Sequence, residues 1–279
     1  MTVYARPIGL DEALQVLSRG GFSILAGGTD HYPARVGRAL RENILDLSAI
    51  PALRGITERD GHWRFGANTT WTELIDGKLP PLFDGLRQAA REVGGLQIQN
   101  RGTIAGNVCN ASPAADGIPP LLALDAQVEV ASSAGTRLVA LEEFLVANRR
   151  TVLAPGELVT ALVVPKPKHA ARSRFLKLGT RKYLVISIVM VAATIEHEAG
   201  KVRRARVAVG ACSPVARRLP ELEAALEGRA VDGTLGEAAT ASHLRALTPI
   251  DDVRASSGYR NQAALTLVKR TLDALGATG

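Results

Sequence analysis

Apolar residues near the start of the chain first follow helical spacing and then gather in short runs. Leu10, Leu14 and Leu17 recur at helical spacing, and Gly20-Gly21 predicts the end of that helix. The apolar segments at 22–25 and 43–47 then predict two strands. Residues 1–50 therefore predict a small unit of the β-α-β type.

The middle of the chain predicts a second unit in which short strands flank several helices. Asp60-Gly61 is typical of a hairpin turn. The same patterns predict, in order, a hairpin at 55–67, helices from about Thr72 and over 81–93, a strand at 127–131, a short helix at 141–146 and a strand at 158–164.

The segment Val164–Lys168 predicts a linker, because proline and lysine dominate it. Strands followed by helices are expected beyond it, which indicates an α+β domain. The expected strands lie at 175–178, 184–196 and 202–210, and the expected helices at 214–226 and about 258–275. We therefore expect one domain over 1–165, with subdomains of about 1–53 and 54–165, and a second domain over 170–279.

Composition places the chain among ordinary globular proteins. It has 279 residues, of which 46% are hydrophobic and 22% charged. The apolar run at 184–193 is too short to cross a bilayer and predicts a buried strand, so we expect no transmembrane segment. The first residues lack the pattern of a secretory leader. Two distant cysteines and histidines without ligand spacing predict a cytoplasmic protein with no iron–sulfur cluster and no metal site of its own.

The net charge of +7 is concentrated in the second half of the chain. Residues 1–165 carry 15 Lys/Arg and 17 Asp/Glu, whereas residues 166–279 carry 19 and 10. This asymmetry predicts a basic face that meets an acidic ligand or partner. Aromatic residues make up only 4%, and no nucleic-acid-binding motif is present. We therefore expect this face to dock a protein subunit and not nucleic acid.

Two stretches with almost no side-chain bulk carry the candidate chemistry. Residues 99–116 read QNRGTIAGNVCNASPAAD, where Gly102 and Gly106 would permit the positive φ of tight turns. The second stretch, AGGTD at 26–30, directly follows the predicted strand at 22–25. Successive N–H groups in such turns form anion-binding concavities. Two of these turns in one domain predict two walls around one pyrophosphate.

Other catalytic signatures are absent from the sequence. No G-x-G-x-x-G follows the first predicted strand, and no G-x-x-x-x-G-K-[ST] is present, which excludes the common nucleotide-binding motifs. No G-x-S-x-G or H-E-x-x-H occurs. Ser112 and Asp116 lie four residues apart without a histidine beside them, so we assign no catalytic residue.

Four motifs in order resemble the FAD-binding medium subunit of the molybdenum hydroxylases, the family of carbon monoxide dehydrogenase and xanthine dehydrogenase. They are AGGTD at 26–30, QIQNRGTIAGN at 97–107 with the following ASPAAD, PGELV at 155–159 and FLK at 175–177. The resemblance covers nearly the whole chain. It implies an α+β protein in which an FAD-binding domain of two small α/β subdomains (PCMH-type) precedes a C-terminal α+β domain with an antiparallel sheet and helices.

The resemblance also implies how FAD is held. The two turns would grip the pyrophosphate, Ser112 and Asp116 would bond ribityl or ribose hydroxyls, and Lys177 would lie near the isoalloxazine. Val93 and Val159 would pack on the cofactor, although both would serve equally well as plain core residues. The full set of expected cofactor-binding residues is Leu25, Ala26, Gly27, Gly28, Thr29, Asp30, His31, Val93, Thr103, Ile104, Ala105, Gly106, Asn107, Ser112, Asp116, Val159 and Lys177.

The segment after Lys177 departs from the family pattern. Related chains carry two arginines and then acidic residues near the flavin ring, whereas this chain reads TRKYLV at 180–185. The departure leaves NAD, a quinone, oxygen and a carrier protein as alternative electron acceptors. Tyr183 is either a cover for a flavin face or a core aromatic at a strand start.

The resemblance implies an electron-transfer subunit. A large partner subunit would hold molybdopterin, a small one would hold [2Fe–2S] clusters, and the complex would be a dimer of heterotrimers. Two alternatives remain open at this point. One is a stand-alone flavin oxidoreductase on the same fold, which would need an acid–base residue of its own. The other is a non-enzymatic basic binding protein, which would be colourless.

Overall fold

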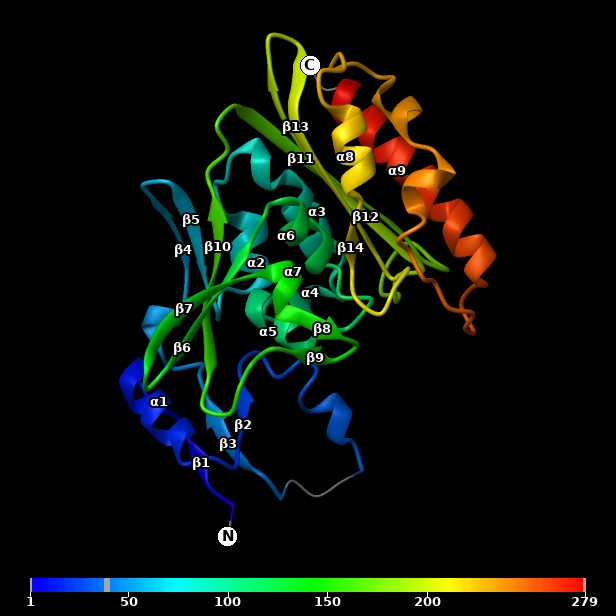
Figure 1. Ribbon diagram of the computed structural model, residues 1–279. Helices are drawn as coiled ribbons and strands as arrows, with labels where there is room; N and C mark the ends of the chain where they lie inside the picture. Colours follow the sequence, from blue (N-terminus) through cyan, green and yellow to red (C-terminus); the bar gives the residue numbers. More distant parts are fainter. Residues whose placement is uncertain (1, 38–40, 278–279) are drawn as a thin grey trace.

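The computed structural model describes residues 2–37 and 41–277. The chain runs from an N-terminal unit (residues 2–53) through a central unit (54–165) to a C-terminal unit (170–277). Figure 1 shows the two ends of the chain at opposite ends of the molecule.

The N-terminal unit is a three-stranded parallel sheet in the order β1-β3-β2, with one helix beside it. Gly20 and Gly21 follow the helix with φ of 75° and 74°, as the sequence predicts for its end. The β-α-β prediction is confirmed, with one two-residue strand added that is too short to leave a pattern. The elements are β1 (Tyr4–Ala5), α1 (Leu10–Ser18), β2 (Phe22–Leu25) and β3 (Asn43–Asp46).

The central unit is built on a five-stranded antiparallel sheet in the order β4-β5-β10-β6-β7, against which its helices pack. Its core includes the fully buried rings of Phe65, Trp71 and Phe83. The strands are β4 (Ile56–Arg59), β5 (His62–Gly66), β6 (Gln127–Ser132), β7 (Gly135–Ala140), β8 (Leu145–Ala147), β9 (Arg150–Thr151) and β10 (Leu158–Pro165). The helices are α2 (Trp71–Asp76), α3 (Asp84–Glu92), α4 (Leu96–Gln99), α5 (Ile104–Asn110), α6 (Ile118–Ala123) and α7 (Leu141–Phe144).

Two predictions for the central unit need correction. The stretch 99–116 is not a run of turns, because α5 occupies residues 104–110 within it. Neither Gly102 nor Gly106 has a positive φ. The helix expected at 141–146 ends at Phe144, because Leu145 already pairs with Thr151 in a small two-stranded sheet.

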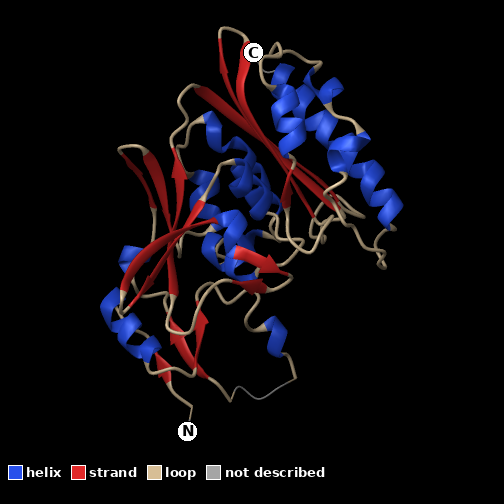
Figure 2. Ribbon diagram, viewed as in Figure 1, coloured by secondary structure: helices blue, strands red, loops and turns tan. Residues whose placement is uncertain are grey.

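The C-terminal unit is an antiparallel sheet in the order β11-β12-β13-β14, with two helices on one of its faces (Figure 2). Alternate side chains of β12 divide between the two faces, as the pleat requires. Val189 and Val191 pack with α8 and α9, whereas Met190 and Ala192 pack with α3 and α6 of the central unit. The elements are β11 (Ala170–Leu178), β12 (Val189–Glu198), β13 (Lys201–Gly210), β14 (Arg217–Arg218), α8 (Pro220–Leu226) and α9 (Ser257–Ala277).

Three predicted ranges differ from these elements. The strand expected from Leu184 begins at Val189, because Leu184 has a φ of 52° and lies in an exposed loop. The strand expected at 175–178 begins earlier, at Ala170, where the linker ends. The helix expected at 214–226 begins at Pro220, because residues 217–218 pair with β13 as β14.

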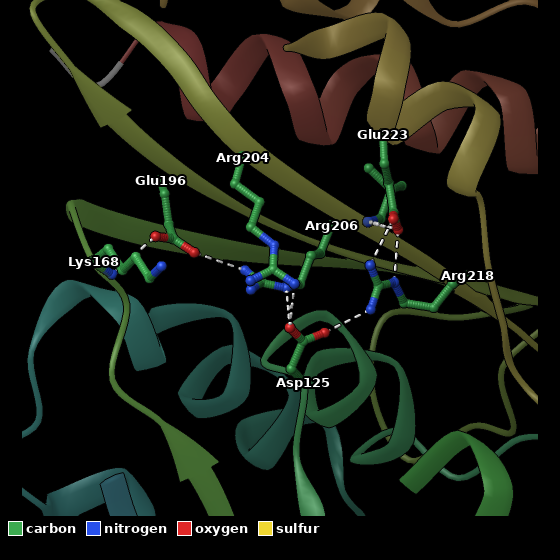
Figure 3. A network of polar contacts seen from close by, with 8 residues as sticks. Asp125, Lys168, Glu196, Arg204, Arg206, Arg218 and Glu223 are labelled. Atoms are coloured by element: carbon green, nitrogen blue, oxygen red, sulfur yellow. Dashed lines mark hydrogen bonds and ion pairs between the residues drawn. The ribbon is translucent and has the colours of Figure 1, made fainter. Parts of the chain in front are cut away.

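A clasp of charged side chains joins the central and C-terminal units (Figure 3). Asp125, which follows α6, accepts hydrogen bonds from Arg206 at 2.6 Å, Arg204 at 3.0 Å and Arg218 at 2.6 Å. Arg206 also donates to Glu196 at 3.0 Å. Three of the positive charges of the second half are therefore paired with a single carboxylate of the central unit.

Candidate cofactor site

A cavity of about 530 Å³ lies between the N-terminal and central units. One wall is the turn after β2, and the opposite wall is the start of α5. Ile24 and Val159 add apolar surface, and the ring of Trp71 lies at the base. The two bare stretches of the sequence therefore face one another, as the pyrophosphate prediction requires.

Three glycines of the two stretches have different structural reasons. A Cβ on Gly27 would lie 2.0 Å from the carbonyl oxygen of Arg101. Gly28 has a φ of 77°, a conformation that L side chains rarely adopt. A Cβ on Gly106 would lie 2.7 Å from Oγ1 of Thr103, which caps α5 by accepting a hydrogen bond from the Gly106 N–H at 3.1 Å. Packing between the two walls therefore requires Gly27, whereas Gly28 is required by its backbone conformation and Gly106 by the side chain that caps its own helix.

Three residues that line the cavity each contain one buried polar atom that has no hydrogen-bond partner among the residues that the structure describes. The atoms are Nε2 of His31, Oδ1 of Asn68 and Oδ1 of Asn107. Buried polar atoms normally find partners, because leaving one unpaired costs about 1–3 kcal/mol. Burial lowers the pKa of His31, with a further contribution from Arg35, so its imidazole is neutral at pH 7. These residues therefore offer a polar ligand hydrogen-bonding groups that the described protein residues leave unpaired.

A second cavity of about 420 Å³ adjoins the first. Ser112 and Asp116 line it, together with residues 184–186 of the C-terminal unit. The lining residues that it shares with the first cavity are Asp30, Val93, Asn107, Asn110 and Arg149. An extended ligand could thus run from one cavity into the other.

Asp116 is held by two side chains of the C-terminal unit. Its Oδ2 accepts a hydrogen bond from Nζ of Lys177 at 2.8 Å, and its Oδ1 accepts one from Ser187 at 2.6 Å. The Asp116 and Lys177 side chains are only 10% and 5% exposed. Burial raises the pKa of Asp116, while the charge of Lys177 and both hydrogen bonds oppose that rise. Lys177 points inward, as its strand context predicts.

The structure brings most of the predicted site residues together. Ser112 and Asp116 line the second cavity and Lys177 lies behind Asp116, whereas Leu25 and Ile104 are buried behind the walls. The twelve that line the first cavity are Ala26, Gly27, Gly28, Thr29, Asp30, His31, Val93, Thr103, Ala105, Gly106, Asn107 and Val159.

Fourteen of the described residues that line the first cavity are absent from the predicted set, and one interpretation is wrong. Among the fourteen, Asn68 and Trp71 lie between the predicted hairpin and the predicted helix, and Arg149 lies in a hairpin turn for which the sequence predicts no element. Tyr183 is 59% exposed and lies in the loop before β12, so it is not a core aromatic at a strand start.

Comparison with known proteins decides the family. Residues 1–167 match the model of the FAD binding domain in molybdopterin dehydrogenase, and residues 174–275 match that of the CO dehydrogenase flavoprotein C-terminal domain. The chain is an FAD-binding medium subunit of the molybdenum hydroxylase family. FAD is therefore its cofactor, and it acts as the flavoprotein subunit of an oxidoreductase.

Relatives of this medium subunit match it over nearly its whole length. It is 30% identical to the xanthine dehydrogenase FAD-binding subunit of Escherichia coli O157:H7, over 99% of this chain and 97% of the relative. It is 34% identical to the 6-hydroxypseudooxynicotine dehydrogenase complex subunit alpha of Paenarthrobacter nicotinovorans, over 94% and 90%. Reconstituted CO dehydrogenase from Oligotropha carboxidovorans superposes with a TM-score of 0.90 at 26% identity, over 100% and 99% of the two chains.

Two features are absent from residues 2–37 and 41–277. None of the helices there combines the length and apolar character that crossing a bilayer requires. The same residues contain no group of three or more His, Cys, Asp or Glu side chains placed to hold a metal ion.

Proposed function

We propose that this medium subunit relays electrons within a larger complex. Its FAD takes electrons from [2Fe–2S] clusters of a small partner subunit and passes them to a terminal acceptor. A large partner subunit holds molybdopterin and oxidises the substrate, and the complex assembles as a dimer of heterotrimers. The free thiols of Cys109 and Cys212 fit a reducing, cytoplasmic location.

The pair of adjoining cavities, lined by residues whose buried polar atoms lack a partner within the described part of the chain, carries this proposal. Bound FAD supplies electron transfer in both single and paired steps. The chain contributes binding and electrostatics. The turn after β2 and the start of α5 hold the pyrophosphate, and the imidazole of His31 and the amides of Asn68 and Asn107 find partners on the ligand.

The remaining assignments follow from the second cavity. The carboxylate of Asp116 accepts hydrogen bonds from ligand hydroxyls, and the hydroxyl of Ser112 donates to them or accepts from them. Val93 and Val159 form apolar walls. Lys177 lies near the isoalloxazine and fixes the carboxylate of Asp116 in one orientation. We also propose the domain division 1–165 and 170–279, with the two subdomains of the first meeting at the cofactor.

Flavin content tests the proposal. The purified chain is expected to show a flavin absorption spectrum, or to acquire one on addition of FAD, with the released cofactor identified by mass. Gly106→Trp is expected to abolish retention of flavin, because the indole would fill the wall beside Thr103. Gly233→Trp is the matched control, since Gly233 is exposed and nothing lies within 4 Å of its added Cβ.

The outcomes separate the alternatives. A wild-type chain that stays colourless with added FAD, both alone and with its partner subunits, would exclude the electron relay and favour the basic binding protein. Normal flavin content in a folded Gly106→Trp variant, as judged by circular dichroism, would show that the cofactor binds elsewhere.

A further inference from the structure

Arg149 lies where the two cavities meet. It forms the tip of the hairpin between β8 and β9 and has a φ of 55°, a conformation uncommon for a residue with a side chain. Its backbone N–H donates to the carbonyl of Ala111 at 2.8 Å. Its guanidinium donates from one terminal nitrogen to Oδ1 of Asn110 at 2.6 Å. Both contacts join the hairpin to the end of α5.

The charges around the two cavities single out this arginine. Arg35 also lines the first cavity, but it forms an ion pair with Glu42. Arg149 has no carboxylate partner within the described part of the chain. Asp30 lines both cavities and adds a negative charge that an anionic ligand must meet.

We infer that Arg149 binds the pyrophosphate of the dinucleotide at the junction of the two cavities. The inference rests on the proposed function and adds to it a residue outside the expected binding set. The turn after β2 and the start of α5 offer only uncharged N–H groups to a doubly charged pyrophosphate. A planar guanidinium matches phosphate oxygens with paired hydrogen bonds, and charge-assisted bonds of this kind are about twice as strong as neutral ones.

The backbone of Arg149 supports a role beyond packing. A non-glycine residue at positive φ is strained, and such residues gather at ligand-binding positions. Asn110 fixes one terminal nitrogen and leaves the rest of the guanidinium without a partner among residues 2–37 and 41–277. The side chain is thereby oriented before the ligand arrives, which reduces the entropy lost on binding.

Titration of the cofactor-free full chain with FAD tests this assignment. Arg149→Gln is expected to weaken FAD binding about tenfold at low salt, in line with a charge-assisted bond at a partly exposed site. The defect is expected to shrink as salt is raised, because added ions screen exposed charges. Arg149→Lys keeps the charge and is expected to recover most of the affinity. Arg150→Gln is the matched control, since Arg150 is exposed and lines neither cavity.

Each outcome bears on one proposal or on both. Wild-type affinity in Arg149→Gln, or a defect that neither salt nor Arg149→Lys changes, would overturn the role of Arg149 and leave the electron-relay proposal standing. Failure of the wild-type chain to bind FAD would overturn both. Weakening by Arg150→Gln to the same extent would replace a specific contact with a general effect of net charge.

Discussion

Replacing Lys177 with methionine should lower the free energy of unfolding, because the charge of Asp116 would then be buried without its ion-pair partner. Methionine fills nearly the same space as the lysine stem, so the change opens no cavity. It removes a charge, the hydrogen bond to Asp116 and a longer one of 3.4 Å to the carbonyl of Glu92. The 2.6 Å hydrogen bond from Ser187 would then be the one described side-chain contact left to offset the cost of burying the charged carboxylate, which is 10% exposed. The variant isolates the electrostatic part of the contact between the central and C-terminal units.

The loss in free energy of unfolding follows from the burial of the ion pair. Removing one partner of a buried ion pair costs about 3–5 kcal/mol, and the bond from Ser187 places Lys177→Met at the lower end, about 3 kcal/mol. For a chain of this size, about 3 kcal/mol lowers Tm by roughly 6–12 °C. Scanning calorimetry of the cofactor-free chain measures the loss. Lys78→Met is the matched control, because Lys78 is exposed and should change Tm little.

The sign of the pH dependence provides a second readout. Lys177 lowers the pKa of Asp116, so its removal raises an already raised pKa further. An ionised acid whose folded-state pKa lies above the unfolded value destabilises the fold, and protonation below the folded-state pKa removes that cost. The stability gap between Lys177→Met and wild type should therefore narrow as the pH falls from about 7.5 to about 5.

A double variant measures how the two charges depend on one another. Asp116→Asn together with Lys177→Met removes both charges and should recover part of the lost stability at neutral pH. The reasoning is refuted if Lys177→Met costs under about 1 kcal/mol, the range of an exposed pair, or if its cost stays the same across the pH range.

Two further changes probe the fold around the site. Thr103→Ala removes the cap of α5 and should cost about 1 kcal/mol in urea unfolding, whereas Thr103→Ser should restore it; equal loss in both would point to the methyl group instead. Asp125→Asn removes the carboxylate that three arginines share and should cost about 2 kcal/mol, against almost nothing for the exposed turn residue in Asp60→Asn; a wild-type melting curve for Asp125→Asn would mean that the clasp adds no stability.

The sequence predicted which two stretches face one another better than it described the backbone there. Bare stretches at 26–30 and 99–116 indicate where two segments can approach closely, because they carry little side-chain bulk. They do not distinguish a turn from a short helix, so α5 was missed. Its start is set by the local cap from Thr103 and by a bridge between Thr103 and Thr70, and the second of these joins segments that are distant in the sequence.

Residues that join separate segments were the hardest to predict. Asn68 and Arg149 reach the cavities through loops whose positions depend on the sheet, and no periodic pattern marks them. The apolar residues between Leu184 and Ile188 predict a strand, yet Leu184 and Ile186 lie exposed in a loop. An apolar side chain therefore does not by itself indicate a strand, because its burial depends on the whole fold and not on local structure alone.

The walls of the adjoining cavities come from all three units of the chain, which makes the cofactor a structural component as well as a chemical one. A ligand that binds only the folded state stabilises it by about 2.7 kcal/mol at a hundred times its Kd. Cellular supply of the cofactor would thus set how much of this subunit survives unfolding and proteolysis. Abundance of the chain would then track cofactor synthesis before any electron is transferred.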